Sequence, residues 1–192
     1  MKPLSECVLR SFAVASALLV GAPHGYAAQS ILALGFNLHS GSDMDSIAGS
    51  NSFSGMVGAE SSSGAFRVGV GLEGHYGTAI LNYNDDLSST ERLGAELRFG
   101  ARIHFFESAL LQPMLAASGI LALDLFRASD PPTGISSSEA ATGLGYEVEA
   151  GIGIPWGASQ LRLLGAYGIL STKLGSRTIV LDRISMRLAL SY

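Results

Sequence analysis

The sequence predicts an all-β fold, an eight-stranded antiparallel up-and-down transmembrane β-barrel, and three observations lead to it. After residue 27, most of the chain alternates apolar and polar residues with the period of two that marks β-strands. The alternating runs are longer than the five or six residues usual in soluble proteins, and their length suits a tilted strand that crosses a bilayer. No apolar run approaches the roughly 20 residues that a membrane-spanning helix needs.

The first 27 residues have the pattern of a cleaved secretory signal peptide. Lys2 and Arg10 precede a short apolar run over 12–22, and small residues follow at the positions that a signal peptidase recognises. We therefore expect an exported chain whose mature part, residues 28–192, is a single barrel domain without cysteine. This part carries ten basic and fifteen acidic residues, a net charge of −5, and nothing in it indicates nucleic-acid binding.

The first three predicted strands occupy the chain up to residue 76. Alternation is clear in the first strand, over 32–39, and weak in the second, over 52–60. A loop rich in Gly, Ser and Asp is predicted between them at 40–50. A tight turn at 61–64 then leads to a third strand that alternates cleanly over 66–76.

The remaining five predicted strands show the same alternation. They extend over 93–105, 111–125, 144–156, 161–169 and 184–192. Long and short connections alternate between the strands: longer loops are predicted at 77–90 and 127–139, tight turns at 107–109 and 157–159, and a brief loop at 173–176. Such alternation is typical of membrane barrels, whose two rims face different compartments.

One face of each strand is uncharged, and we expect this face to contact lipid. A charge on the lipid side of a barrel costs about 2–4 kcal/mol at the bilayer midplane. Aromatic residues on this face lie near strand ends and predict two interfacial girdles, with Phe66, Phe105, Trp156 and Tyr192 on the turn side and Tyr76 and Tyr167 towards the loops. The opposite face carries most strand glycines, which suits a narrow barrel filled by side chains.

The inward face predicts a lumen filled with charges of both signs. Five acidic residues oppose six arginines there: Glu73, Glu96, Asp124, Glu147 and Glu149 against Arg67, Arg98, Arg102, Arg162, Arg183 and Arg187. Leaving one partner of a buried ion pair alone costs about 3–5 kcal/mol, and an ion-selective pore would show one dominant sign. We therefore expect a salt-bridged network that plugs the lumen; a network that opens and conducts small solutes is the alternative.

Taken together, the signal, eight alternating strands, three tight turns and aromatic carboxyl end resemble the small Gram-negative outer-membrane barrels of the OmpA transmembrane-domain, OmpX and opacity-protein type. The final Met186, Leu188, Leu190 and Tyr192 are similar to the signal by which the barrel-assembly machinery recognises its substrates. The resemblance implies an outer-membrane location, contact with outer-membrane lipid and lipopolysaccharide, a monomer, and a structural or surface-interaction role. A peptidoglycan-binding domain like that of OmpA is absent, so no cell-wall tether is expected.

Enzymes that modify lipid A also use this scaffold, which makes the histidines relevant. His39, His75 and His104 lie on inward faces, but His104 is predicted at the opposite end of the barrel, so a three-histidine metal site is not expected. The His-x-Ser pattern of the deacylases is absent. The palmitoyltransferase pattern, a loop histidine with an adjacent Asp-Ser, is matched only by His39 with Asp45-Ser46. Asp85-Asp86 is similar to the acidic pair of outer-membrane proteases but lacks a matching His-Asp. We expect no catalytic residue, metal or cofactor.

A soluble periplasmic ligand-binding barrel, with its apolar faces inward, is the remaining alternative. Glycines on the charged face argue against it, because such an interior needs bulky residues on one side of each strand. The predicted loops hold a net charge of −6, and an acidic surface would bridge to lipopolysaccharide through divalent cations. The residues counted in these loops are Asp43, Asp45, Glu60, Asp85, Asp86, Glu91, Glu107, Asp130, Glu139 and Asp182 against Arg92, Arg127, Lys173 and Arg177.

Overall fold

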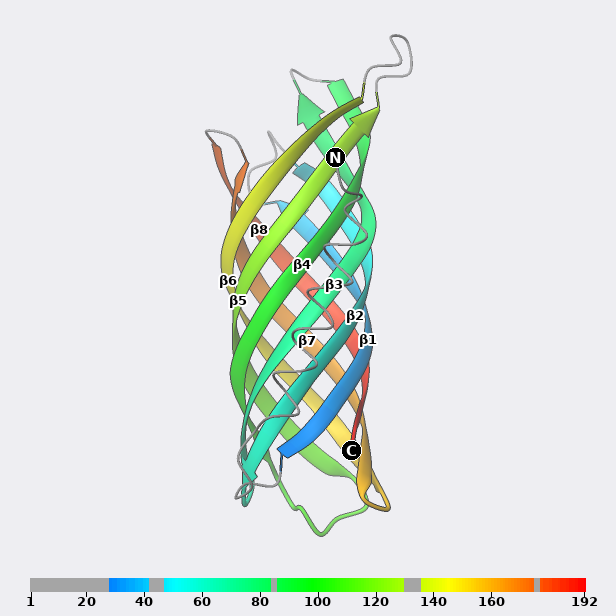
Figure 1. Cartoon of the computed structure of the whole chain (residues 1–192), viewed down its shortest axis with the longest axis vertical. Coiled ribbons are helices and arrows are strands. Elements are labelled where there is room, and N and C mark those ends of the chain that lie inside the picture. Colours follow the sequence, from blue (N-terminus) through cyan, green and yellow to red (C-terminus); the bar gives the residue numbers. More distant parts are fainter. Residues whose placement is uncertain (1–27, 42–46, 84–85, 130–135, 175–176) are drawn as a thin grey trace.

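Eight antiparallel strands close into one barrel in a computed structural model that describes residues 28–41, 47–83, 86–129, 136–174 and 177–192. The strands are β1 (Ala28–Gly41), β2 (Ile47–Ser63), β3 (Phe66–Tyr83), β4 (Asp86–His104), β5 (Gln112–Ser129), β6 (Ser136–Trp156), β7 (Ser159–Leu174) and β8 (Arg177–Ser191). Each strand pairs with its neighbours in sequence, and β8 pairs back onto β1 (Figure 1). The predicted fold class is confirmed; the predicted signal peptide lies outside the described residues.

The strands are longer than the sequence predicted, at 14 to 21 residues. Strand β3 continues to Tyr83 and β4 begins at Asp86, so most of the loop predicted at 77–90 is paired sheet. The loop predicted at 127–139 is shortened in the same way by β5 and β6, and β2 begins at Ile47, inside the loop predicted at 40–50. On these extensions the outer face carries polar residues such as Thr78, Ser89 and Glu91, so the apolar contrast that identifies a strand is weakened while the backbone pairing continues.

Two of the three turns on the opposite side are tighter than predicted. Ser63 pairs with Phe66 around Gly64-Ala65, and Trp156 pairs with Ser159 around a second two-residue turn that begins at Gly157. Gly64 and Gly157 have φ angles of 58° and 62°, which two-residue hairpin turns require and glycine adopts without strain. The third turn, between β4 and β5, is longer and includes Phe106 at a positive φ of 54°.

The outer face of the barrel is an apolar belt bounded by polar residues. On β8 the belt covers the nine residues from Ile184 to Tyr192, within the 9–11 that a tilted strand needs to cross a bilayer. At the loop side the belt ends where charged residues appear on the outer face, and strand pairing places Glu91 beside Arg127 there. Among the described residues, the chain forms no helix long and apolar enough to cross a membrane.

The interior is divided into sections of different chemistry. A loop-side apolar cluster consists of Ala79, Ile120, Ala122, Phe126, Ala141, Leu170, Ile179 and Leu181. A smaller turn-side cluster consists of Ile31, Ala33, Met114, Leu164 and Ala189, with Met56 packed against it. Charged side chains fill the space between and around these clusters. The sequence predicted the polar interior but not its apolar sections, several of whose residues lie where it placed loops or strand ends.

Candidate functional site in the barrel lumen

Ion pairs among residues of the seven strands from β2 to β8 form a connected network in the lumen. Strand alternation sends the side chains of one parity inward, so residues distant in sequence converge across the barrel. All eleven charged residues assigned to the lumen from the sequence lie there, either buried or, for Arg67 and Arg102, with 13% and 11% of the side chain exposed. The network also includes Glu60 and Arg92, which the sequence analysis had placed in loops.

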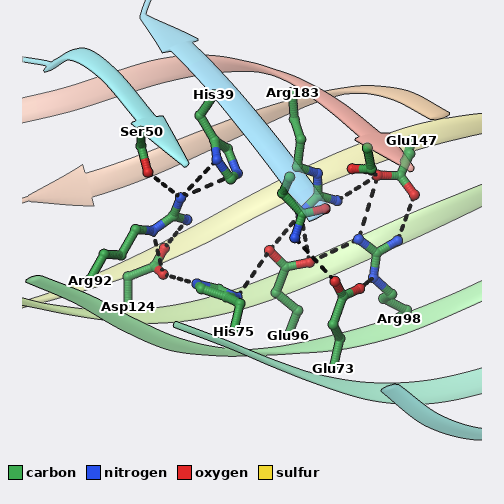
Figure 2. A network of polar contacts seen from close by, with 12 residues as sticks. His39, Ser50, Glu73, His75, Arg92, Glu96, Arg98, Asp124, Glu147 and Arg183 are labelled. Atoms are coloured by element: carbon green, nitrogen blue, oxygen red, sulfur yellow. Dashed lines mark hydrogen bonds and ion pairs between the residues drawn. The ribbon is translucent and has the colours of Figure 1, made fainter. Parts of the chain in front are cut away.

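Arg98 lies at the centre of this network. Its guanidinium contacts three carboxylates, with Nε 2.5 Å from Glu73, Nη1 2.6 Å from Glu147 and Nη2 3.1 Å from Glu96 (Figure 2). Arg183 bridges two of the same carboxylates, at 2.6 Å from Glu96 and 2.9 Å from Glu147. We call the six residues Glu73, Glu96, Arg98, Glu147, Arg183 and Arg187 the central network. Its three arginines match its three carboxylates.

Arg187 completes the central network and joins it to the turn side. Its Nη1 lies 2.6 Å from Glu147 and 3.0 Å from Glu149, and its Nη2 donates a second hydrogen bond to Glu147 at 3.0 Å. Asn37 of β1 adds a neutral donor, at 3.3 Å from Glu73. Each carboxylate therefore meets several donors, which is the condition under which buried charges are tolerated.

Asp124 and Arg92 form the loop-side end of the network. Two parallel hydrogen bonds of 2.9 Å join the Arg92 guanidinium to both oxygens of Asp124. His75 Nε2 lies 2.6 Å from the same carboxylate, and Arg92 Nη1 lies 3.1 Å from His39 Nδ1 (Figure 2). Gly94 of β4 lies next to this contact, and a Cβ at Gly94 would overlap the side chains of both Asp124 and His75. Glycine at this position lets the two side chains meet.

Three arginines surround Glu60 at the turn side. Arg102 donates to one carboxylate oxygen, Arg162 Nη1 lies 2.8 Å from the other, and Arg67 is 3.9 Å away. Arg102 also contacts Glu149 at 2.9 Å, which connects this group to the central network. We call Glu60, Arg67, Arg102, Glu149 and Arg162 the turn-side charged cluster. A cavity of about 50 Å³ lies beside it.

Glu60 and Arg92 correct the sequence analysis, which counted both as surface loop residues. Both are buried, Arg92 completely. The alternation along the strands already indicates an inward position for both residues. Arg92 has the same parity as Glu96 and Arg98 on β4. Glu60 has the same parity as Ser62, the residue of β2 that pairs with Arg67 of β3. Arg92 was missed because β4 begins before the segment with strong apolar contrast, and Glu60, the last residue of the predicted second strand, was missed because alternation in that strand is weak. Because one acidic and one basic residue leave the surface count together, the net charge of −6 inferred from the predicted loops is unchanged.

The histidines lie at opposite ends of the lumen. His39 and His75 both contact the Arg92–Asp124 pair, whereas His104 lies at the turn side of β4, opposite Met114. Within the described part of the chain, no group of three or more His, Cys, Asp or Glu residues could hold a metal ion. Asp45, Ser46 and Asp85, considered for enzyme patterns, lie outside the described residues.

The predicted girdle residues all lie on the outer face. Trp156 is the most exposed of them, at 74%. The hydroxyl of Tyr167 donates a 2.8 Å hydrogen bond to Asp182 at the loop-side edge of the belt. The chain end is part of the sheet, because Tyr192 exchanges two backbone hydrogen bonds with Ser30. Met186, Leu188 and Tyr192 are exposed on the outer face and Leu190 is partly buried there.

Comparison with known proteins gives a match in structure. No protein-family model matches the chain, and no curated protein sequence matches it either. The crystal structure of Neisserial surface protein A matches with a TM-score of 0.56 at 15% identity, over 86% of this chain and 97% of that one. The Ail protein of Yersinia pestis, in complex with the heparin analogue sucrose octasulfate, matches with a TM-score of 0.50 at 13% identity over the same shares.

The fold is that of the small outer-membrane barrels. The predicted resemblance is therefore confirmed at the level of fold. At these low sequence identities, the similarity shows the arrangement of the strands and not the role of individual residues.

Proposed function

We propose that the chain is an outer-membrane β-barrel protein with a structural or surface-interaction role and a lumen closed by its ion-pair network. The observation that carries this proposal is the contrast between the two faces of the same strands. Around Leu97, for example, β4 presents an exposed apolar side chain outward while the neighbouring Glu96 and Arg98 are buried inside. Only a barrel with an apolar environment outside and paired charges inside makes this arrangement favourable.

Several features support an outer-membrane location. The apolar belt has the height of a bilayer strand, and outward charges such as Glu91, Arg127 and Asp182 occur at its loop-side edge, where they meet water or lipid headgroups. The amino-terminal signal pattern would direct export. The Met186–Tyr192 segment would then be recognised by the barrel-assembly machinery. The chain would function as a monomer, since a closed barrel leaves no unpaired strand edge.

Burial of the central network supports a closed lumen. Arg98 is only 4% exposed, and Glu73 and Glu147 are inaccessible, whereas side chains lining a water-filled channel would be exposed to it. Opening such a channel would separate Arg98 from three carboxylates at once. The energetic cost of unpaired buried charge favours closure over small-solute conduction.

Exposed basic side chains at the loop-side edge provide a contact for lipopolysaccharide. Arg127 on β5 and Lys173 on β7 both point outward and are exposed. Anionic phosphate groups of the surrounding lipid would lie at the same level as these two cations. The divalent-cation bridge inferred from the sequence stays a second prediction for this contact. Glu60 and Arg92 both leave the surface count, so nine acidic residues still oppose three basic ones and the net charge is still −6.

The first experiment compares the gel mobility of the protein from isolated outer membranes with and without boiling. A folded membrane barrel resists detergent and shifts on heating. Recovery in the soluble periplasmic fraction without a shift would contradict the proposal and favour the ligand-binding barrel.

Planar-bilayer recording then tests closure. The natural chain is expected to give no steady current, whereas Arg98→Ala is expected to give one if the variant folds, because a large side chain leaves the centre of the lumen. Steady conductance by the natural chain would support the small-solute pore instead. Mass spectrometry of lipid A from cells with and without the protein tests the enzymatic alternative; the proposal expects identical spectra.

A further inference from the structure

The turn-side charged cluster has more positive than negative charge. Arg67, Arg102 and Arg162 oppose two carboxylates, Glu60 and Glu149, and Glu149 is shared with Arg187 of the central network. The other two sections are matched, with three arginines and three carboxylates in the central network and Arg92 with Asp124 at the loop side. The excess cation is therefore localised at the turn side of the lumen.

Unused hydrogen-bond donors occur in the same cluster. Arg67 Nε, Arg102 Nε and Arg162 Nη2 are buried and have no hydrogen-bond or ion-pair partner among the described residues. The Arg162 side chain is completely inaccessible, and the Arg102 side chain is about nine-tenths buried. Buried guanidinium donors without a partner are costly, so an arrangement that gathers three of them indicates a missing acceptor.

A cavity of suitable size and lining lies at this place. Its volume is about 50 Å³, several times the roughly 10–15 Å³ that one water molecule requires by this measure. Arg67, Arg102 and the hydroxyl-bearing Ser118 line it together with Glu60. Arg98 and Glu149 also line the cavity, so three arginines and two carboxylates face it, and the rest of the lining consists of apolar residues such as Met56 and Ala116 and of four glycines.

We propose that this cavity binds a small inorganic anion, a halide or a phosphate, held by Arg67 and Arg102 and balanced by the excess charge of the cluster. Water would satisfy the unused donors but would not neutralise the charge. A divalent or organic cation is disfavoured, because three guanidinium groups repel it. Arg67 and Arg102 retain 13% and 11% side-chain exposure, which leaves a route for the anion from the turn-side compartment.

The test measures the urea midpoint of unfolding of the folded, purified barrel at constant ionic strength. Sodium gluconate, whose anion is too large for the cavity, is replaced stepwise by sodium bromide or by sodium phosphate. A ligand that binds only the folded state raises the midpoint with its concentration and then saturates. Saturation with bromide alone identifies a halide site, and saturation with phosphate alone identifies an oxyanion site.

Arg67→Gln is the informative variant. Its ion pair with Glu60 is the longest in the cluster at 3.9 Å, and its other printed contact is a 2.5 Å hydrogen bond to the neutral Gln29. Its loss therefore breaks no short ion pair and leaves two cations against two carboxylates. The anion-dependent shift is expected to disappear in this variant. Lys173→Gln removes a positive charge from the exposed outer face and serves as the matched control, in which the shift is retained.

Crystals of the natural chain grown in bromide provide a second measurement that requires no variant. An anomalous peak between Arg67 and Arg102 is expected. Identical midpoints in all three salts would overturn the proposal, and so would a shift that persists in Arg67→Gln. A bromide peak without any effect on the midpoint would indicate an adventitious ion only and would overturn it as well.

Discussion

The central network and the loop-side apolar cluster fill neighbouring sections of one lumen by opposite means. In the central network, Arg98 and its carboxylate partners are held at defined distances of 2.5–3.1 Å. In the apolar cluster, Ile120, Leu170 and Leu181 are equally buried but are held only by packing. The comparison shows that burial alone does not predict what a side chain contributes. Directional ion pairs fail when one partner is removed, whereas apolar packing weakens gradually with the volume removed.

The largest expected effect is that of Arg98→Met, which keeps much of the side-chain volume but removes the charge. Three carboxylates would lose a common partner, so the free energy of unfolding should fall by about 3–5 kcal/mol. Equilibrium unfolding in urea, in detergent or lipid vesicles, measures it. Lys173→Met on the outer face is the control, expected to stay within about 0.5 kcal/mol. A loss below that of the control would mean that the central network does not hold the lumen.

Asp124→Asn tests the loop-side end of the same network and should have an intermediate effect. The amide keeps the shape but loses the charge that pairs with Arg92 through two 2.9 Å hydrogen bonds. Because hydrogen bonds to charged groups contribute about 1.5–3 kcal/mol, a loss of that size is expected in the same unfolding experiment. Asp182→Asn, which affects only an exposed bond from Tyr167, should change little. If both variants lost the same free energy of unfolding, the buried Asp124 pair would contribute no more to stability than the exposed Asp182 contact.

Ile120→Val should have the smallest effect of the three. It removes one methylene from the loop-side apolar cluster without leaving an unpaired group, and such changes cost about 0.5–1.5 kcal/mol. Conductance should be unchanged, since the central network remains intact. A loss as large as that of Arg98→Met would show that the apolar cluster, rather than the ion pairs, determines the stability of the barrel.

Much of this architecture was predictable because the local sequence of a strand indicates which of its side chains point to the lipid and which point to the lumen. Ile184, Met186 and Leu188 alternate with Ser185 and Arg187 whatever the rest of the chain does, since successive side chains of a strand point to opposite faces. Eight such segments predicted eight strands, and their alternation separated the eleven predicted lumen charges from the lipid-facing residues. Where the outer face is polar, as around Thr78 and Ser89, this contrast is lost, and the predicted loops were too long for that reason.

The sequence by itself determined the fold class, the inward face of eleven of the thirteen lumen charges among the described residues, and the near balance of their signs. Only the tertiary structure decided which charges meet, because Arg98 and Glu147 lie 49 positions apart and are brought to 2.6 Å by the closure and stagger of the barrel. Alternation along a strand is a local property of the backbone, whereas contacts across the lumen depend on the register of all eight strands together. The unmatched charge of the turn-side cluster became visible only when that register placed Glu60 among three arginines.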